Sequence, residues 1–311
     1  MKHLFAAPLA LIVSTAFAAP ALAEDNAATT AVVAAEVEAP AETGESAGPA
    51  LWKVADEDTT IYLFGTVHAL PKDVEWYKGD IADALASSGT IVTEITMDDS
   101  MPAKMQELVM TKGMLPQGTT LRSLLDDDQR GAYETAMTKL GMPVGALDQF
   151  EPWYAGMLLT MLPLLQQGYS PDSGVEQVLL SKATSAQRDA LETIDFQIGL
   201  FDELPIESQI SFLVETASTI DDIKPTLDAM VKEWLAGDAR DLAVLMNEGL
   251  TDEVLAEQLL YARNRNWAQW VDQRLDTPGT VFVAVGAGHL AGDKSVQDAL
   301  EDIGIETQRV Q

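Results

Sequence analysis

The chain has 311 residues, no cysteine and a formal net charge of -30 at pH 7. Such a charge repels nucleic acid and anionic lipid, so neither is expected as a partner. The absence of cysteine excludes disulfides and a lipid anchor on cysteine, and stability must therefore come from an apolar core.

The N-terminus has the order of a secretory signal peptide. Lys2 precedes an apolar run from Leu4 to Ala18, and Pro20-Ala21-Leu22-Ala23 stands before Glu24. A membrane anchor is the alternative, but the apolar run has about 15 residues and a helix that spans a bilayer needs about 20. We therefore expect residues 1–23 to be removed and the mature protein to be periplasmic or secreted, without membrane contact.

Residues 24–50 are expected to form a disordered acidic linker. They are dominated by Ala, Glu, Thr, Pro and Gly, and they contain no basic or aromatic residue that could anchor them to a core. The remaining residues, 51–311, suit one α/β domain, because no second low-complexity stretch interrupts them.

The first two strands of this domain are predicted at Thr59–Phe64 and Thr90–Ile95. The first strand is β-branched and aromatic, and it leads into the turn Gly65-Thr66-Val67-His68. The second is almost continuously apolar, and Glu94 is out of place in such a buried strand. Both strands therefore deliver a polar side chain near their ends.

A third strand, of the buried parallel type, is predicted at Thr280–Val285. It leads into a second turn of the same pattern, Gly286-Ala287-Gly288-His289. Most of the chain between the second strand and this one reads as helix, with a further strand candidate at 190–194. A final helix is expected at 293–303 and an edge strand at 306–310. The predicted fold class is α/β, with a largely parallel central sheet flanked by helices and a helical insertion between the second and later strands.

The predicted strands place three ionisable side chains at one edge of the sheet. In such sheets ligands bind beyond the carboxyl ends of the strands, and His68, Glu94 and His289 all lie at such ends. His68 and His289 are the two histidines that remain after removal of the signal peptide. The alternative is that these histidines only form hydrogen bonds within their turns.

These motifs resemble the TraB/GumN family, which also contains the PrgY pheromone-shutdown proteins and the animal TIKI Wnt proteases. The resemblance covers residues 51–311. It implies a fold similar to the haem-binding ChaN and erythromycin-esterase-like proteins. The motifs that carry it are Leu51-Trp52-Lys53-Val54, Ile61 to His68, Thr93-Glu94, Arg263-Asn264 and Val285 to Leu290.

The resemblance also implies a set of site residues. Two histidines, a glutamate and an Arg-Asn pair carry over as His68, His289, Glu94, Arg263 and Asn264. A solvated helix face is the alternative for the Arg-Asn pair. Gly174-Val175-Glu176 stands where the family often has Gly-hydrophobic-Asp, and the longer acid weakens any role carried over to Glu176.

Two imidazoles and one carboxylate are the ligand set of a catalytic metal site that leaves one position for water. We expect His68, Glu94 and His289 to hold a divalent metal ion, with zinc, manganese and cobalt as candidates. The ion would activate water and polarise a carbonyl group, and the TIKI resemblance indicates peptide substrates. A metal-free hydrolase stays open: one histidine would be the general base, Glu94 would orient it, and the other histidine with Arg263 would stabilise an oxyanion.

Two functions therefore compete. The leading one is an exported, metal-assisted hydrolase of peptides or small molecules, with His68, Glu94, His289, Arg263 and Asn264 as its catalytic residues. The second is a binding protein that sequesters a peptide or haem without catalysis; haem would need an axial histidine and an apolar slot. The sequence leaves the substrate, the identity of the metal and the oligomeric state open.

Three other segments favour structural roles. Four methionines between Met101 and Met114 could form a substrate lid, but methionine at this spacing favours core packing. The apolar run from Trp153 to Leu165 is too short to span a bilayer and favours a buried helix. Asp126-Asp127-Asp128 favours a helix cap over calcium binding, because EF-hand spacing is absent.

The signal peptide makes a prediction about mass. Because Ala21 and Ala23 satisfy the small-residue rule for cleavage, the mature N-terminus should be Glu24. The intact mass of protein recovered from the periplasm measures this directly. Retention of residues 1–23 in a membrane fraction would show instead that the segment is an anchor.

Overall fold

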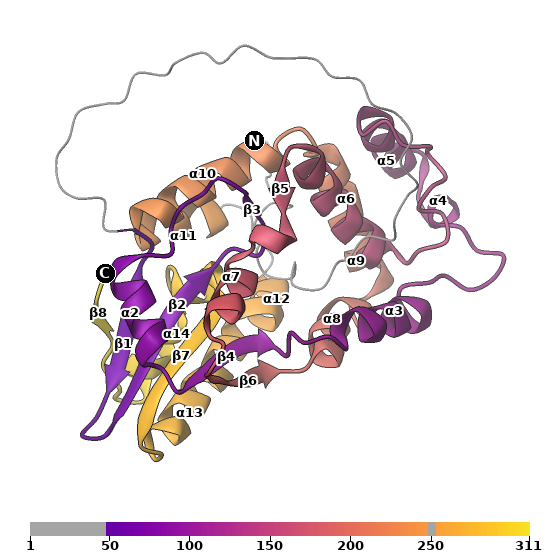
Figure 1. Ribbon diagram of the computed structural model, residues 1–311. Coiled ribbons are helices and arrows are strands. Elements are labelled where there is room, and N and C mark those ends of the chain that lie inside the picture. Colours follow the sequence, from indigo (N-terminus) through magenta and orange to yellow (C-terminus); the bar gives the residue numbers. More distant parts are fainter. Residues whose placement is uncertain (1–47, 248–252) are drawn as a thin grey trace, which may run out of the picture.

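A six-stranded sheet forms the centre of the molecule (Figure 1). The computed structural model describes residues 48–247 and 253–311. The first four strands in spatial order run parallel to one another. The next strand, β1 (Leu51–Ala55), is antiparallel to both of its neighbours. The predicted α/β class with a largely parallel sheet is therefore confirmed. In spatial order the strands are β6 (Gln187–Glu192), β4 (Thr90–Ile95), β7 (Gly279–Gly286), β2 (Thr59–Thr66), β1 and β8 (Gln308–Arg309).

Helices fill the connections between the parallel strands. Between β2 and β4 lies α2 (Gly79–Ser87), and β7 is followed by α14 (Val296–Asp302). From β4 to β6 the chain forms α3 (Met101–Lys112), α4 (Leu121–Leu124), α5 (Asp127–Lys139), α6 (Pro152–Gln166), the 3-10 helix η2 (Pro171–Ser173) and α7 (Val175–Lys182). From β6 to β7 it forms α8 (Ile194–Asp202), α9 (Ile206–Ser218), α10 (Ile223–Ala236), α11 (Ala239–Asn247), α12 (Glu253–Ala256), the π-helix η3 (Glu257–Tyr261) and α13 (Ala262–Leu275). A second sheet pairs β3 (Leu70–Pro71) with β5 (Tyr169–Ser170).

The two central strands, β2 and β7, are covered on both faces because their side chains alternate. Ile61 and Leu63 of β2 pack in one cluster with Trp267 of α13 and residues of α14. Phe64 and Phe282 belong to the opposite face, where residues of α2, α7 and α10 cover them. At the carboxyl edge, α3 and α8 continue from β4 and β6 and carry the chain beyond the sheet (Figure 1).

One predicted strand is displaced along the chain. The candidate at 190–194 lies instead at 187–192, where it pairs with β4 in parallel. The physical reason is Thr193, whose side chain accepts the backbone N–H of Phe196 and so caps the start of α8. The strand therefore ends at Glu192, which becomes the last residue before a helix.

The described structure begins before the predicted domain boundary. Gly48, Pro49 and Ala50, which the sequence placed in the linker, are buried, and residues 51–55 form β1 against β2. No strand had been predicted there, because the segment is short and partly polar. The predicted signal peptide, residues 1–23, and residues 24–47 of the predicted linker lie outside the described residues.

The predicted buried helix and helix cap are confirmed, the final helix begins at Val296, and the prediction of core packing for the methionines is confirmed by full burial only at Met105. The run from Trp153 to Leu165 lies within α6, whose side chains are mostly buried despite Pro163. Asp126 accepts the backbone N–H of Gln129 at 2.9 Å and caps α5, as expected. The methionines of α3 divide between a buried Met105 and an exposed Met110. In residues 48–247 and 253–311, no helix combines the length and apolarity that crossing a bilayer demands.

Trp234 connects α10 to the start of the first Gly-x-x-His turn. Its indole N–H donates to the carbonyl oxygen of Gly65 at 2.8 Å. Its ring lies in an aromatic group with Phe64 and Trp76, and the side chain is 3% exposed. Water therefore cannot replace this donor, and the contact fixes α10 over the turn.

Replacing Trp234 by phenylalanine should lower the free energy of unfolding by about 1–3 kcal/mol. The smaller ring leaves a gap, and the Gly65 carbonyl oxygen loses a buried donor. The urea midpoint measures the loss, with Trp270→Phe as a control at a half-buried tryptophan of α13. Equal midpoints for the Trp234 variant and the unmodified protein would contradict the proposed anchoring role.

Candidate active site

The two Gly-x-x-His turns lie side by side at the ends of neighbouring parallel strands. β2 and β7 pair along their whole length, and the second turn continues as the 3-10 helix η4 (Ala287–Leu290). A Cβ atom on Gly65 would lie 3.0 Å from Cα of Ala287, so glycine allows the turns to touch. His68 and His289 thereby reach the same edge of the sheet, as the topology led us to expect.

Glu94 enters this edge from β4, the other neighbour of β7. Its Oε1 accepts the backbone N–H of Gly286 at 2.6 Å and lies 4.0 Å from Nε2 of His289. Its Oε2 accepts from Arg263 at 2.7 Å and from Gln197 at 2.8 Å. The carboxylate therefore ties β4 to the second turn and keeps one oxygen toward His289.

Arg263 and Asn264 both face the site from α13. They are 1% and 2% exposed, so the alternative of a solvated helix face is wrong. Arg263 donates to Glu94 and also, through Nε and Nη2, to the two oxygens of Glu192 at 2.8 Å each. Asn264 Oδ1 lies 2.5 Å from Nδ1 of His289. Arg263 thus bridges two acids, whereas Asn264 holds a histidine.

Glu192 and Gln197 also belong to this network, and sequence reasoning missed both. Glu192 ends β6 and accepts the indole N–H of Trp267 at 3.0 Å in addition to Arg263. Gln197, on α8, donates to Glu94 at 2.8 Å and to Glu192 at 3.0 Å. Glu192 ends a parallel strand, which was a usable signal, but the predicted strand ran past it to residue 194.

His289 is held as a neutral imidazole. The Asn264 amide N–H donates to the carbonyl oxygen of Lys294 at 2.8 Å, so Asn264 Oδ1 faces His289 and accepts the proton on Nδ1. Burial, with the nearby charges of Arg263 and His68, holds the pKa of His289 well below its ordinary value. Nε2 therefore carries a lone pair, and within the described chain it has no hydrogen-bond partner.

His68 has an acidic partner instead. Its Nδ1 lies 2.5 Å from Oε1 of Glu176, in the first turn of α7, and the Thr66 hydroxyl donates to the same oxygen at 2.5 Å. Burial alone would lower the pKa of His68, but the Glu176 carboxylate outweighs burial and raises it. Burial would raise the pKa of Glu176, and His68 and Thr66 lower it. Glu176, to which the sequence assigned no firm role, is thus the partner of His68.

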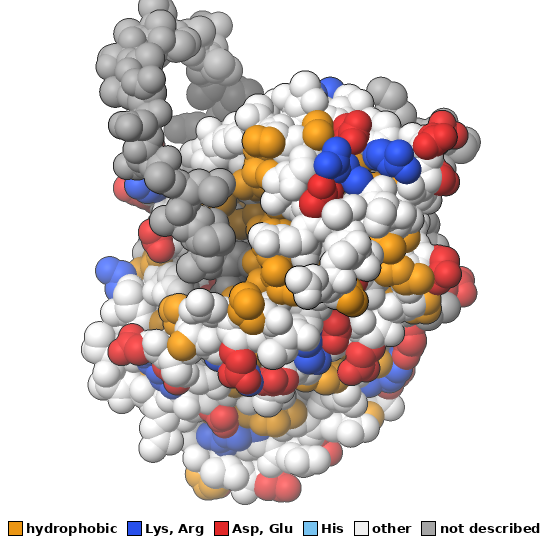
Figure 2. Space-filling view, turned by 90° about the vertical axis from the view of Figure 1, so that its right-hand side faces the viewer, with side chains coloured by type: hydrophobic (Ala, Val, Ile, Leu, Met, Phe, Trp, Pro, Cys, Tyr) orange, Lys and Arg blue, Asp and Glu red, His pale blue; other side chains and the backbone are white. Residues whose placement is uncertain are grey.

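In both imidazoles Nδ1 lies 2.5 Å from a side-chain oxygen and Nε2 has no hydrogen-bond partner among the described residues; the Asn264 contact of His289 is a hydrogen bond, whereas the Glu176 contact of His68 is an ion-pair distance without hydrogen-bond geometry. Histidines that bind metals have this arrangement, because the second ring nitrogen donates to a carboxylate or carbonyl group. The side chains are closed off from solvent, at 4% and 0% exposure for His68 and His289. On the face drawn in Figure 2, no histidine reaches the surface.

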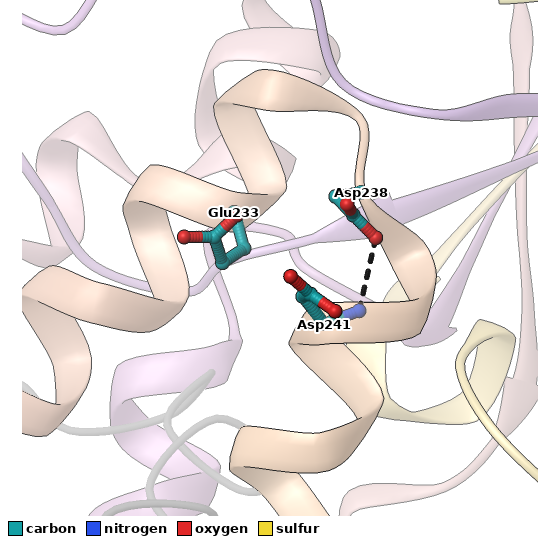
Figure 3. A group of neighbouring side chains, drawn as sticks. All are labelled: Glu233, Asp238 and Asp241. Carbon is teal, nitrogen blue, oxygen red and sulfur yellow. Dashed lines mark hydrogen bonds between the residues drawn. The ribbon is translucent and has the colours of Figure 1, made fainter.

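A different set of side chains has the tighter spacing of a metal site. Of the His, Asp and Glu side chains described, the set of three whose ligand atoms all lie within 4.8 Å of one another is Glu233, Asp238 and Asp241 (Figure 3). Asp238 accepts the backbone N–H groups of Arg240 and Asp241 at 3.1 and 2.9 Å and so caps α11. Lys232 donates to Glu233 at 2.6 Å. These contacts explain the set as a helix cap beside an ion pair.

The neutral state of His289 makes stability depend on pH. An unfolded histidine has a pKa of about 6.5, whereas the pKa of folded His289 is far lower. Below about pH 6.5 the unfolded chain binds a proton that the folded chain excludes, so stability present above this pH is lost as the pH falls. His68, with its raised pKa, acts in the opposite direction: its contribution is complete below about pH 6.5 and is lost as the pH rises through its folded pKa.

Replacing His289 by alanine should remove the loss of stability that occurs below about pH 6.5. Between about pH 7 and pH 5, the metal-free parent should lose about 2 kcal/mol more unfolding free energy than His289→Ala. Urea unfolding of chelator-treated protein at both pH values measures the difference. Equal pH dependence in the two proteins would contradict the assignment of His289 as neutral.

The family model described as TraB/PrgY/gumN family matches residues 50–309. The match includes the four parallel strands, both Gly-x-x-His turns and α13. No curated protein and no solved structure matches the chain significantly. By the extent of this match, the chain belongs to the TraB/PrgY/gumN family.

Proposed function

We propose that this chain is an exported hydrolase of amide or ester bonds, with peptides as its substrate class. In this proposal a divalent metal ion is held by Nε2 of His68, Nε2 of His289 and Oε1 of Glu94. The observation that carries it is the pair of buried imidazoles, each with Nδ1 2.5 Å from a side-chain oxygen and Nε2 without a hydrogen-bond partner in the described chain. Export is supported by the order of residues 1–23.

The types of donor atom and their charge suit a divalent ion, whereas the ligand atoms of His68, His289 and Glu94 do not all lie within 4.8 Å of one another. Glu94 and Glu192 are largely buried around one buried guanidinium, that of Arg263, so a dication would offset the remaining negative charge. His289 Nε2 and Glu94 Oε1 are 4.0 Å apart, against about 3.3 Å for two ligands of a tetrahedral zinc ion. The proposal therefore requires the ligands to draw closer when the ion binds.

The residues around the ligands would position them. When bound, the ion would lower the pKa of a water molecule toward about 7 and polarise a carbonyl group. Arg263 donates from Nε, Nη1 and Nη2 to Glu192, to the Leu259 carbonyl oxygen and to Glu94. Its donors are thus committed to holding Glu94, which disfavours the earlier hypothesis that Arg263 stabilises an oxyanion.

A metal-free version of the same reaction is supported by the opposite pKa shifts of the two histidines. The pKa of His289 is low, so His289 would take a proton from water as the general base. The pKa of His68 is raised, so His68 would donate a proton or stabilise the developing negative charge. The metal content of active protein decides between the two versions.

A surface groove supports access for a substrate. It has a volume of about 610 Å³ and is lined by Leu290, which directly follows His289, and by Arg240 and Arg309. A small pocket of about 10 Å³ continues from it and is lined by Gly65 and Ala287 of the two turns. Trp52, Ala239 and Leu290 line both spaces. The walls are partly apolar and partly polar, and they carry Arg240, Arg309 and Asp293, so charged groups of a peptide would find partners of both signs.

Replacing any one of the three ligands should abolish metal binding and hydrolysis together. Purified mature protein is analysed for metals and tested with peptide and ester substrates, next to His68→Ala, Glu94→Gln and His289→Ala. Each variant should lose measurable metal binding while circular dichroism keeps the native signal, because apolar clusters on both faces of β2 and β7 hold the sheet. Glu233→Gln, in the acidic group that caps α11, is the control and should keep both properties.

Three outcomes would overturn parts of the proposal. Wild-type metal content in all three variants would show that the ion is bound elsewhere. Turnover without any metal would select the metal-free reaction. A haem-induced Soret shift that disappears in His68→Ala, together with no turnover, would favour the binding protein over the hydrolase.

A further inference from the structure

We propose that Glu176 is a positioning residue for His68, holding the ring so that Nδ1 carries the proton and Nε2 keeps its lone pair for the site. The proposal concerns ring orientation and tautomer. It rests on the proposed function only for its effect on metal binding.

The Glu176 carboxylate has two partners on one oxygen. Oε1 lies 2.5 Å from Nδ1 of His68, and it accepts the Thr66 hydroxyl at 2.5 Å. Glu176 is 3% exposed, so water does not compete for these contacts. The contact is an ion-pair distance without hydrogen-bond geometry, and because an ionised carboxylate accepts and cannot donate, we expect the proton of neutral His68 on Nδ1, the ring nitrogen next to it. In neutral His68 the lone pair therefore lies on Nε2.

The backbone brings Glu176 to this place. The N–H of Val175 donates to the carbonyl oxygen of Val67 at 3.0 Å, so the start of α7 is bonded to the first turn. A Cβ atom on Gly174 would lie 2.2 Å from the carbonyl oxygen of His68, which leaves room only for glycine. Glu176 then stands in the first helical turn, where the helix dipole stabilises negative charge. The acid and the turn are held as one unit.

The two histidines are held by groups of different charge. Asn264 offers a neutral amide oxygen to His289, whereas Glu176 offers a carboxylate to His68. A carboxylate partner makes the imidazole a stronger electron donor to a metal, and loss of such partners commonly costs about 10–100-fold in affinity. We therefore assign His68 as the stronger of the two imidazole ligands, and Glu176 as the cause.

The tautomer of His68 can be measured without metal or substrate. The mature protein contains only His68 and His289, so ¹⁵N-histidine labelling gives the ring-nitrogen signals of two residues, and His289→Ala assigns them. At a pH above the range in which the His68 ring signals titrate, so that the ring is neutral despite its raised pKa, unmodified protein should show a protonated Nδ1 and an unprotonated Nε2 for His68. In Glu176→Leu, which offers no acceptor, the ratio of the two tautomers should shift by at least about tenfold toward Nε2–H.

Glu176→Gln is the second variant, because it is close to isosteric and should fold even if the leucine variant does not. Its amide both accepts and donates, so His68 should populate both tautomers. Its Kd for Mn²⁺ should rise about 10–100-fold, whereas Glu176→Asp, which keeps the carboxylate, should recover part of this loss. Asp127→Asn, which removes an equal charge from a fully exposed side chain of α5, should leave the tautomer and the Kd unchanged.

The outcomes separate this inference from the proposed function. If the parent protein binds no Mn²⁺ and hydrolyses nothing, the proposed function fails, and the tautomer signals still test Glu176. If the His68 signals are the same in the parent protein, Glu176→Leu and Glu176→Gln, then Glu176 does not position His68, whether or not metal is bound. A single Nδ1–H tautomer in the parent protein that is lost in the variants supports the proposal.

Discussion

The buried guanidinium of Arg263 is the charge on which the arrangement of the site depends. It joins the acids that end two neighbouring strands, Glu94 of β4 and Glu192 of β6, and its side chain also lies over the Trp267 ring at 4.9 Å. Buried charges are costly to remove from water, and removal of one partner leaves the others uncompensated. The fold therefore tolerates these acids at the strand ends only because α13 delivers Arg263 between them.

The network around Arg263 also holds the second turn. Glu94, held by Arg263 and Gln197, bonds the backbone of the second turn at Gly286. The same helix that carries Arg263 carries Asn264, which fixes His289 in one tautomer. The first turn is held separately, by the contact of Glu176 of α7 with His68. One histidine is thus paired with a neutral amide and the other with an acid.

The sheet and the helices contribute different groups to this chemistry. The strands and their turns supply His68, His289 and Glu94, which lie at the carboxyl edge of the sheet. The helices supply the groups that orient them, because each connection between parallel strands starts at that edge before it crosses a face of the sheet. Such division explains why the orienting residues are far from their partners in sequence. Glu192 and Arg263, for example, are separated by 71 residues.

The sequence by itself determined the class of fold and the three strand-end residues. Runs of β-branched, aromatic and apolar residues identified β2, β4 and β7, and the repeated Gly-x-x-His pattern marked the two turns, because these signals are local. It also identified α6 as buried and Asp126 as a cap. The tertiary structure decided which side chains hold these residues. The roles of Glu176 and Gln197 arise from pairings between distant parts of the chain. Gln197 pairs with Glu94, 103 residues away, and Glu176 pairs with Thr66, 110 residues away. No local pattern encodes such pairings, because they depend on strand order and on where each helix crosses the sheet.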